Sequence, residues 1–118
     1  MLLLKFEYHA DLYNDLVSKL KRIRRRTPIH VDVFRRGVEV YVLALEDGFS
    51  TAFTYAAYLR AKEKGLKASL AYVRYIDEDF LPEEVKELGR KWAHGKLSWK
   101  EIEKLKEMTI TEHVFSKW

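Results

Sequence analysis

The sequence predicts an α+β sandwich in which a four-stranded antiparallel sheet carries two helices on one face. Apolar residues recur at every second position in some segments, as in a half-buried strand, and at every third or fourth position in others, as in a helix. These segments follow the order strand, helix, strand, strand, helix, strand. With 118 residues, of which 47% are hydrophobic and 34% charged, the chain is long and apolar enough for one core without disulfides.

The first two elements are a strand over residues 2–8 and a helix over residues 11–26. Apolar and other residues alternate in the strand segment, and the spacing then becomes helical. We expect Asp11 to be the N-cap, and Pro28 requires the helix to end by about residue 26. The residues predicted to face the core share one helical stripe: Leu12, Leu16, Leu20 and Ile23.

Two segments rich in β-branched residues follow, over residues 29–35 and 38–44, and they predict a β-hairpin. We expect a two-residue turn at Arg36-Gly37, which would place Val33 opposite Val40 and Val31 opposite Val42. In this register the valines share one face of the sheet, and a slip of one residue would destroy that arrangement.

A second helix and a fourth strand complete the predicted domain over residues 1–79. Ser50 or Thr51 is expected to cap the helix, and Gly65 stands where a left-handed residue ends one. The strand is expected over residues 66–76. The resulting β-α-β-β-α-β order favours a ferredoxin-like sandwich. The apolar stripe of the helix comprises Phe49, Phe53, Ala56 and Leu59.

Residues 80–118 predict a helical extension that packs on this core or on a partner. Pro82 is expected at the first helical position, with Val85, Leu88 and Trp92 facing inward. A short second helix is expected from about residue 98 to residue 108, followed by an extended segment that is a candidate terminal strand.

Composition excludes several classes of protein. The absence of cysteine excludes a disulfide scaffold, a thiol nucleophile and zinc sites that need sulfur ligands. No apolar run approaches the ~20 residues needed to cross a bilayer, so we expect a cytoplasmic protein that does not enter membranes. Glutamine is absent and Asn14 is the single asparagine, a composition typical of thermophile proteins.

The net charge of +4 suits contact with a polyanion without requiring it. Two basic clusters are candidate phosphate-binding groups. The first lies at the end of the first predicted helix, where the cations equally well complement the helix dipole. The second lies about 20 Å away along the second strand, at ~3.3 Å per residue, so a polymer can reach both clusters and a mononucleotide cannot. The candidate residues are Lys21, Arg22, Arg24, Arg25 and Arg26 in the first cluster and Arg35 and Arg36 in the second.

Aromatic residues on the face of the sheet opposite the helices give a second reason to consider nucleic acid. Phe34 and Tyr41 are expected there and are candidates for base stacking, as on RNA-binding sheets. The third-strand signature of an RNA-recognition motif is not present after Arg36-Gly37. The leading hypothesis is a small non-enzymatic protein that binds nucleic acid, RNA rather than DNA.

The alternative is a protein-interaction or homodimerising subunit, in which the same sheet face is buried by the extension or by a second copy. An enzyme is the third hypothesis, with Glu7, His30, Asp32 and Tyr41 as a polar group on this face. Alternation alone places polar residues on any exposed sheet face, so we assign no catalytic residues. The sequence predicts no metal site and no cofactor, because it contains no P-loop, dinucleotide fingerprint, nucleophile elbow or zincin helix.

Overall fold

The computed structural model describes residues 1–45, 47–72, 81–94 and 100. Residues 1–72 of this set form six elements in the order β-α-β-β-α-β, and a third helix follows. The elements are β1 (Leu2–Glu7), α1 (Ala10–Arg24), β2 (Val31–Arg36), β3 (Glu39–Ala44), α2 (Gly48–Glu63), β4 (Ala68–Tyr72) and α3 (Glu83–Ala93).

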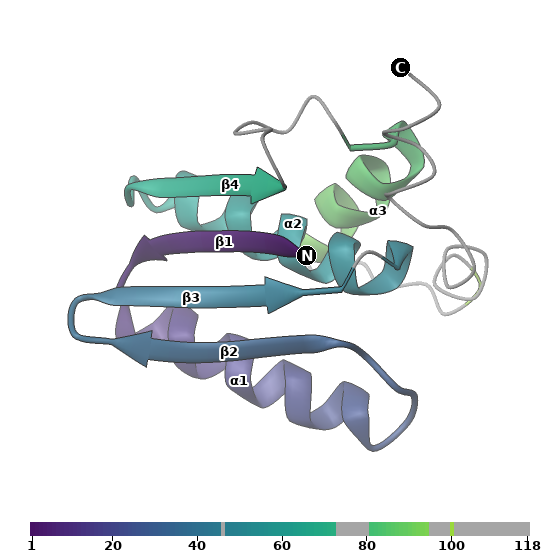
Figure 1. Ribbon diagram of the computed structural model, residues 1–118, viewed down its shortest axis with the longest axis horizontal. Helices are drawn as coiled ribbons and strands as arrows, with labels where there is room; N and C mark the ends of the chain where they lie inside the picture. The colour runs from purple at the N-terminus through teal and green to yellow at the C-terminus, as the bar shows by residue number, and fades with distance from the viewer. Residues whose placement is uncertain (46, 73–80, 95–99, 101–118) are drawn as a thin grey trace.

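The four strands form one open antiparallel sheet in the order β2-β3-β1-β4. Both α1 and α2 lie behind this sheet in Figure 1, so they cover the same face. The predicted α+β class and its four-stranded antiparallel sheet are therefore confirmed. Within the described residues, no helix combines the length and the apolar character needed to span a membrane.

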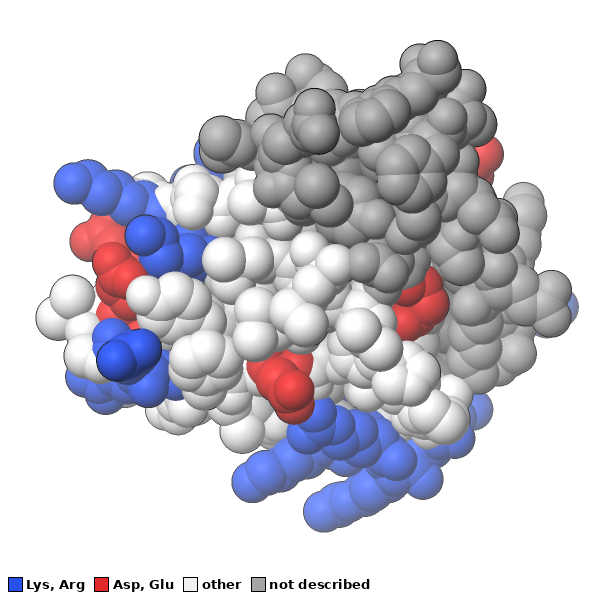
Figure 2. Space-filling view, in the orientation of Figure 1, with Lys and Arg blue, Asp and Glu red and all other residues white. Residues whose placement is uncertain are grey.

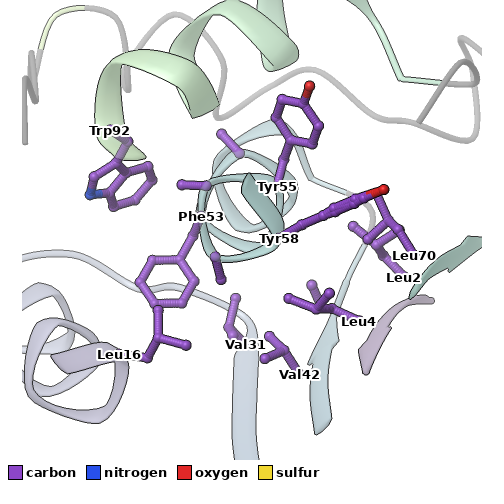
Figure 3. Packing of buried hydrophobic residues seen from close by; sticks show 14 of the residues in the cluster. Leu2, Leu4, Leu16, Val31, Val42, Phe53, Tyr55, Tyr58, Leu70 and Trp92 are labelled. Atoms are coloured by element: carbon purple, nitrogen blue, oxygen red, sulfur yellow. The ribbon is translucent and has the colours of Figure 1, made fainter. Parts of the chain in front are cut away.

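The core lies between the helices and the inner face of the sheet (Figure 3). Alternate residues of β1 and β3 are buried there, among them Leu4 and Val42, neither of which has any exposed surface. Burying one such side chain contributes roughly 1.5–3 kcal/mol relative to leaving it in water. All four residues of the predicted α1 stripe are buried, which confirms the helical spacing: Leu12, Leu16, Leu20 and Ile23.

The predicted register of the hairpin is wrong by two residues. Val33 pairs with Val42 and Val31 with Ala44, so the turn consists of Gly37 and Val38. Gly37 is the first of the two central residues of the turn and has φ +63°. Two-residue hairpin turns require a positive φ at this position, which glycine adopts without strain. Because a shift of two residues preserves the side of the sheet, Val31, Val33, Val40 and Val42 still share one face. Val38, which was predicted to share it, lies in the turn instead and is 78% exposed.

The predicted caps of the first two helices are also wrong. His9 caps α1, because its Nδ1 accepts a hydrogen bond from the Leu12 N–H at 3.3 Å, and Asp11 lies in the first turn instead. Asp47 caps α2 in place of Ser50 or Thr51, and its Oδ1 accepts from the Ser50 N–H at 2.8 Å. In both helices the cap lies three residues before the N–H that it accepts from. Gly65 ends the α2 region with φ +75°, as predicted.

Helix α3 packs against α2 on the side away from the sheet (Figures 1 and 3). The Trp92 ring stacks on Phe49, with centroids 5.4 Å apart, and meets Phe53 edge-on at 5.3 Å. This contact explains why α2 is buried on nearly all sides and not only along its predicted stripe, of which Leu59 is only partly buried. Val85, Leu88 and Trp92 face inward, as predicted.

Parts of the remaining predictions lie outside the described residues. These are the continuation of the fourth strand beyond residue 72, the short helix from residue 98 and the candidate terminal strand. The division into a domain of residues 1–79 and an extension of residues 80–118 stays a prediction. Pro82 is the N-cap of α3, one position before its predicted place.

Candidate nucleic-acid interface

The sheet face opposite the helices is the candidate interface. Figure 2 shows this face from the front: its centre is uncharged, and basic groups lie along its lower border and at its left end. The described helices all lie on the other side of the sheet, and we call this the uncovered face only in the sense that none of these described helices covers it. By strand alternation, it presents Leu3, Lys5 and Glu7 of β1, Asp32, Phe34 and Arg36 of β2, Glu39, Tyr41 and Leu43 of β3, and Ser69 and Ala71 of β4.

Phe34 and Tyr41 form a stacked pair across β2 and β3. They are register partners, with ring centroids 5.2 Å apart and planes inclined by 13°. Phe34 is 42% exposed, whereas Tyr41 is partly buried. The structure thus places both predicted aromatic residues together on the uncovered face.

The hydroxyl of Tyr41 is oriented by a neighbouring carboxylate. It donates to Glu39 Oε2 at 2.6 Å, and Glu39 Oε1 lies 3.9 Å from the Lys5 ammonium. The hydrogen bond to Glu39 raises the pKa of Tyr41, with smaller contributions from desolvation and from the negative charge of Glu39. Tyr41 is therefore a neutral aromatic side chain at physiological pH, held in place against Phe34.

The first basic cluster lies at the C-terminal end of α1. Lys21, Arg22 and Arg25 are exposed there, and Arg26 is exposed beside them. Arg24 connects this end of the helix to the sheet, because its guanidinium donates to the Val31 carbonyl at 2.5 Å and lies 3.5 Å from Asp32 Oδ1.

The second cluster is divided between the two faces of the sheet. Arg36 lies on the uncovered face, whereas Arg35 shares the helix face with Val31 and Val33. The Arg35 guanidinium stacks over the Tyr8 ring, 3.5 Å from its centroid, and its Nε donates to the Gly37 carbonyl at 2.8 Å. Arg24 and Arg36 therefore lie at opposite ends of β2, whose six residues span roughly 17 Å at ~3.3 Å per residue.

The four polar residues considered for catalysis do not converge on one point, since each has a different partner. Glu7 Oε1 accepts from the Lys67 N–H at 2.7 Å, His30 Nδ1 lies 3.3 Å from Asp47 Oδ2, and Asp32 faces Arg24. Tyr41 donates to Glu39. This arrangement offers no shared position for a reacting group.

A contact between His30, Asp47 and Ser50 was not predicted. Ser50 Oγ donates to Asp47 Oδ2 at 2.8 Å and accepts from the His30 backbone N–H at 3.0 Å. An acid, a histidine and a serine also make up hydrolase triads, but here the hydroxyl is fully buried and donates its hydrogen bond to the carboxylate, not to the imidazole. The contact caps α2 and connects it to the start of β2. The Asp-x-x-Ser spacing at residues 47–50 is the sequence signal that indicates it.

Two shallow hollows lie at opposite ends of the uncovered face. One, of about 340 Å³, is lined by Lys5, Glu7, Glu39 and Lys67, with contributions from β4. The other, of about 360 Å³, lies where β2 begins and is lined by side chains that include Met1, Arg24, His30, Asp32, Leu43 and Leu45. Among the residues that the structure describes, no three acidic or histidine side chains gather as a metal-ligand set.

Comparison with protein-family models, with curated proteins and with solved structures finds no match to this chain.

Proposed function

We propose that this chain is a ferredoxin-like, non-enzymatic protein that binds single-stranded nucleic acid, RNA rather than DNA, on its uncovered sheet face. The fold assignment is supported by the β-α-β-β-α-β order, the strand order β2-β3-β1-β4 and the position of both core helices on one face.

The observation that carries the proposal is the exposed Phe34 ring, stacked on Tyr41 at the centre of the β2–β3 surface. An exposed aromatic ring on a flat sheet offers a stacking surface to any unpaired base, and such stacking contributes about 1–3 kcal/mol per base. A duplex keeps its bases stacked internally, so this surface favours a single strand.

The positions of the cations agree with a polymer ligand. Arg22 and Arg25 belong to the end of α1, which contacts the start of β2 through Arg24, and Arg36 ends β2, with the aromatic pair between these two ends. A strand that crosses the aromatic pair can place phosphates near both ends. Asp32 and Glu39 lie on the same face and reduce its positive potential, so we expect affinity in the micromolar range and a strong dependence on salt.

The test is binding of a fluorescently labelled single-stranded RNA of 12 nucleotides, measured by anisotropy in low salt. Phe34→Leu keeps an apolar side chain and removes the ring, and we expect it to weaken binding about tenfold. Val38→Ala alters a more exposed apolar residue, 78% exposed in the hairpin turn, and should leave the affinity unchanged. Absence of binding by the wild type at low salt would overturn the proposal, and the DNA strand of the same sequence tests the preference for RNA.

Self-association through the same face is the second candidate function. Three large apolar side chains are exposed on this side of the sheet: Met1 at 56%, Phe34 at 42% and Leu45 at 47%. If this candidate is correct, light scattering shows a dimer that Phe34→Glu converts to a monomer. A monomeric wild type excludes it.

A further inference from the structure

The hollow where β2 begins has the features of a subsite for one nucleobase. Its volume of about 360 Å³ is lined by apolar side chains of Met1, Leu43 and Leu45, with Arg24, His30 and Asp32 as its polar members. Apolar surface with a few polar groups suits a flat heterocycle whose edge forms hydrogen bonds. A small free anion is a poor fit, because the Asp32 carboxylate would repel it.

The hollow also lies in line with the aromatic pair. Asp32 and Phe34 are two residues apart on the same face of β2, about 7 Å along the strand. A base in the hollow and a base stacked on Phe34 can therefore belong to neighbouring nucleotides of one extended strand.

Asp32 supplies the carboxylate of the hollow. Its side chain is 81% exposed, and its ion pair with Arg24 involves Oδ1 at 3.5 Å. An ionised carboxylate has acceptor atoms and no donor. It thus accepts a hydrogen bond from the exocyclic amino group of cytosine, whereas uracil presents a carbonyl oxygen at the same ring position.

Arg24 supports this arrangement from the other side. Its guanidinium is held by the Val31 carbonyl at 2.5 Å, which keeps a positive charge beside the hollow. That charge partly offsets the carboxylate and so lowers its repulsion of the phosphates of the strand.

From this geometry we propose that the hollow is a nucleobase subsite that selects cytosine over uracil through Asp32. The inference rests on the proposed function, since it names the base preference of the same surface.

The test compares ten-nucleotide oligo(C) and oligo(U) RNA, two pyrimidine strands with the same backbone, by anisotropy at pH 7.5. We expect the wild type to bind oligo(C) about five- to tenfold more tightly. Asp32→Asn should abolish this ratio, because an amide both donates and accepts. Glu7→Gln makes the same change of charge at the other end of the face and should preserve the ratio.

The outcomes separate this inference from the proposed function. Equal affinity of the wild type for the two oligonucleotides overturns the inference and leaves nucleic-acid binding intact. A preference for cytosine that persists in Asp32→Asn overturns it as well, because another group then makes the selection. Absence of binding to either oligonucleotide contradicts the proposed function itself.

Discussion

Gly89 shows how strongly one residue constrains the contact between α2 and α3. A Cβ added there would lie 2.5 Å from Cδ2 of Tyr55, a side chain that is only 2% exposed. The two helices therefore approach each other closely because residue 89 has no side chain.

We predict that Gly89→Ala lowers the free energy of unfolding by about 1–2 kcal/mol. The clash costs about 1–3 kcal/mol, which outweighs the gain of up to ~1 kcal/mol in helix propensity. Urea unfolding followed by circular dichroism measures the difference. In a Tyr55→Ala background, where the ring is absent and only the Cβ of residue 55 stays close, at 3.3 Å, the same substitution should cost clearly less. A loss of equal size in both backgrounds would contradict the explanation.

Asp15 is the clearest titratable contact between α1 and α2. Burial raises the pKa of its carboxyl, but hydrogen bonds from Arg60 and Lys19, and the charges of these two side chains, lower it by more. The net shift is downward. A carboxyl whose pKa is lower in the folded state stabilises the protein above its unfolded pKa of about 3.9, and this contribution disappears as the pH falls through the folded value.

Asp15→Asn should therefore destabilise the protein at pH 7, and the difference from the wild type should be smaller at pH 3, below the unfolded pKa. Because the Asp15 side chain is 35% exposed, we expect no more than about 1 kcal/mol at pH 7. Urea midpoints of the two proteins at both pH values provide the measurement. A difference that is constant with pH would show that the ion pair is not its source.

At the scale of the elements, helix α2 begins at a cap that contacts several groups. The Asp47 carboxylate accepts from the Ser50 N–H and from the Ser50 hydroxyl, and it also contacts His30. Asp47→Ala leaves these buried or partly buried donors without an acceptor, so we predict a loss of about 1–2 kcal/mol of stability.

The matched control is Asp11→Ala, since Asp11 was the expected cap of α1. It lies in the first turn, where its charge interacts only with the helix dipole, and removing it should cost about 0.3–1 kcal/mol. Thermal unfolding of both variants measures the two losses. A larger loss for Asp11→Ala would support the cap predicted from the sequence over the one in the structure.

Elements with a strong periodic pattern were predicted well. The α1 stripe is correct residue by residue, because four apolar positions at helical spacing leave one way to bury the helix. Although the predicted register is wrong, the paired valines of the hairpin lie on the predicted face: Val31, Val33, Val40 and Val42. The face depends only on whether a position is odd or even, and a shift of two residues does not change that. Alternation of side chains does not determine which residue of a turn takes the positive φ. The predicted register was wrong because Gly37 is the first residue of the turn and not the second.

Features that depend on contacts between distant elements were not predicted. Burial of α2 on both sides requires α3, and the stacking of the Arg35 guanidinium on Tyr8 joins the end of β2 to the residue after β1, a contact that strand alternation does not identify. The hollow at the start of β2 combines side chains of the N-terminus, α1, β2 and β3. No local pattern brings these residues together, so the candidate subsite was visible only in the fold.

At the scale of the whole molecule, the basic groups and the aromatic pair make a prediction about salt. If phosphates bind at the end of α1, the logarithm of the RNA association constant falls linearly with the logarithm of the salt concentration, by about 0.7 per neutralised phosphate on a single strand. Arg22→Ala removes one exposed cation from the last turn of α1, so the slope should become shallower by about 0.7. Lys91→Ala removes an exposed cation from the last turn of α3, which packs on α2 away from the sheet, and it should leave the slope unchanged. Equal changes in the two variants would mean that overall charge, and not the position of α1 beside the sheet face, governs binding.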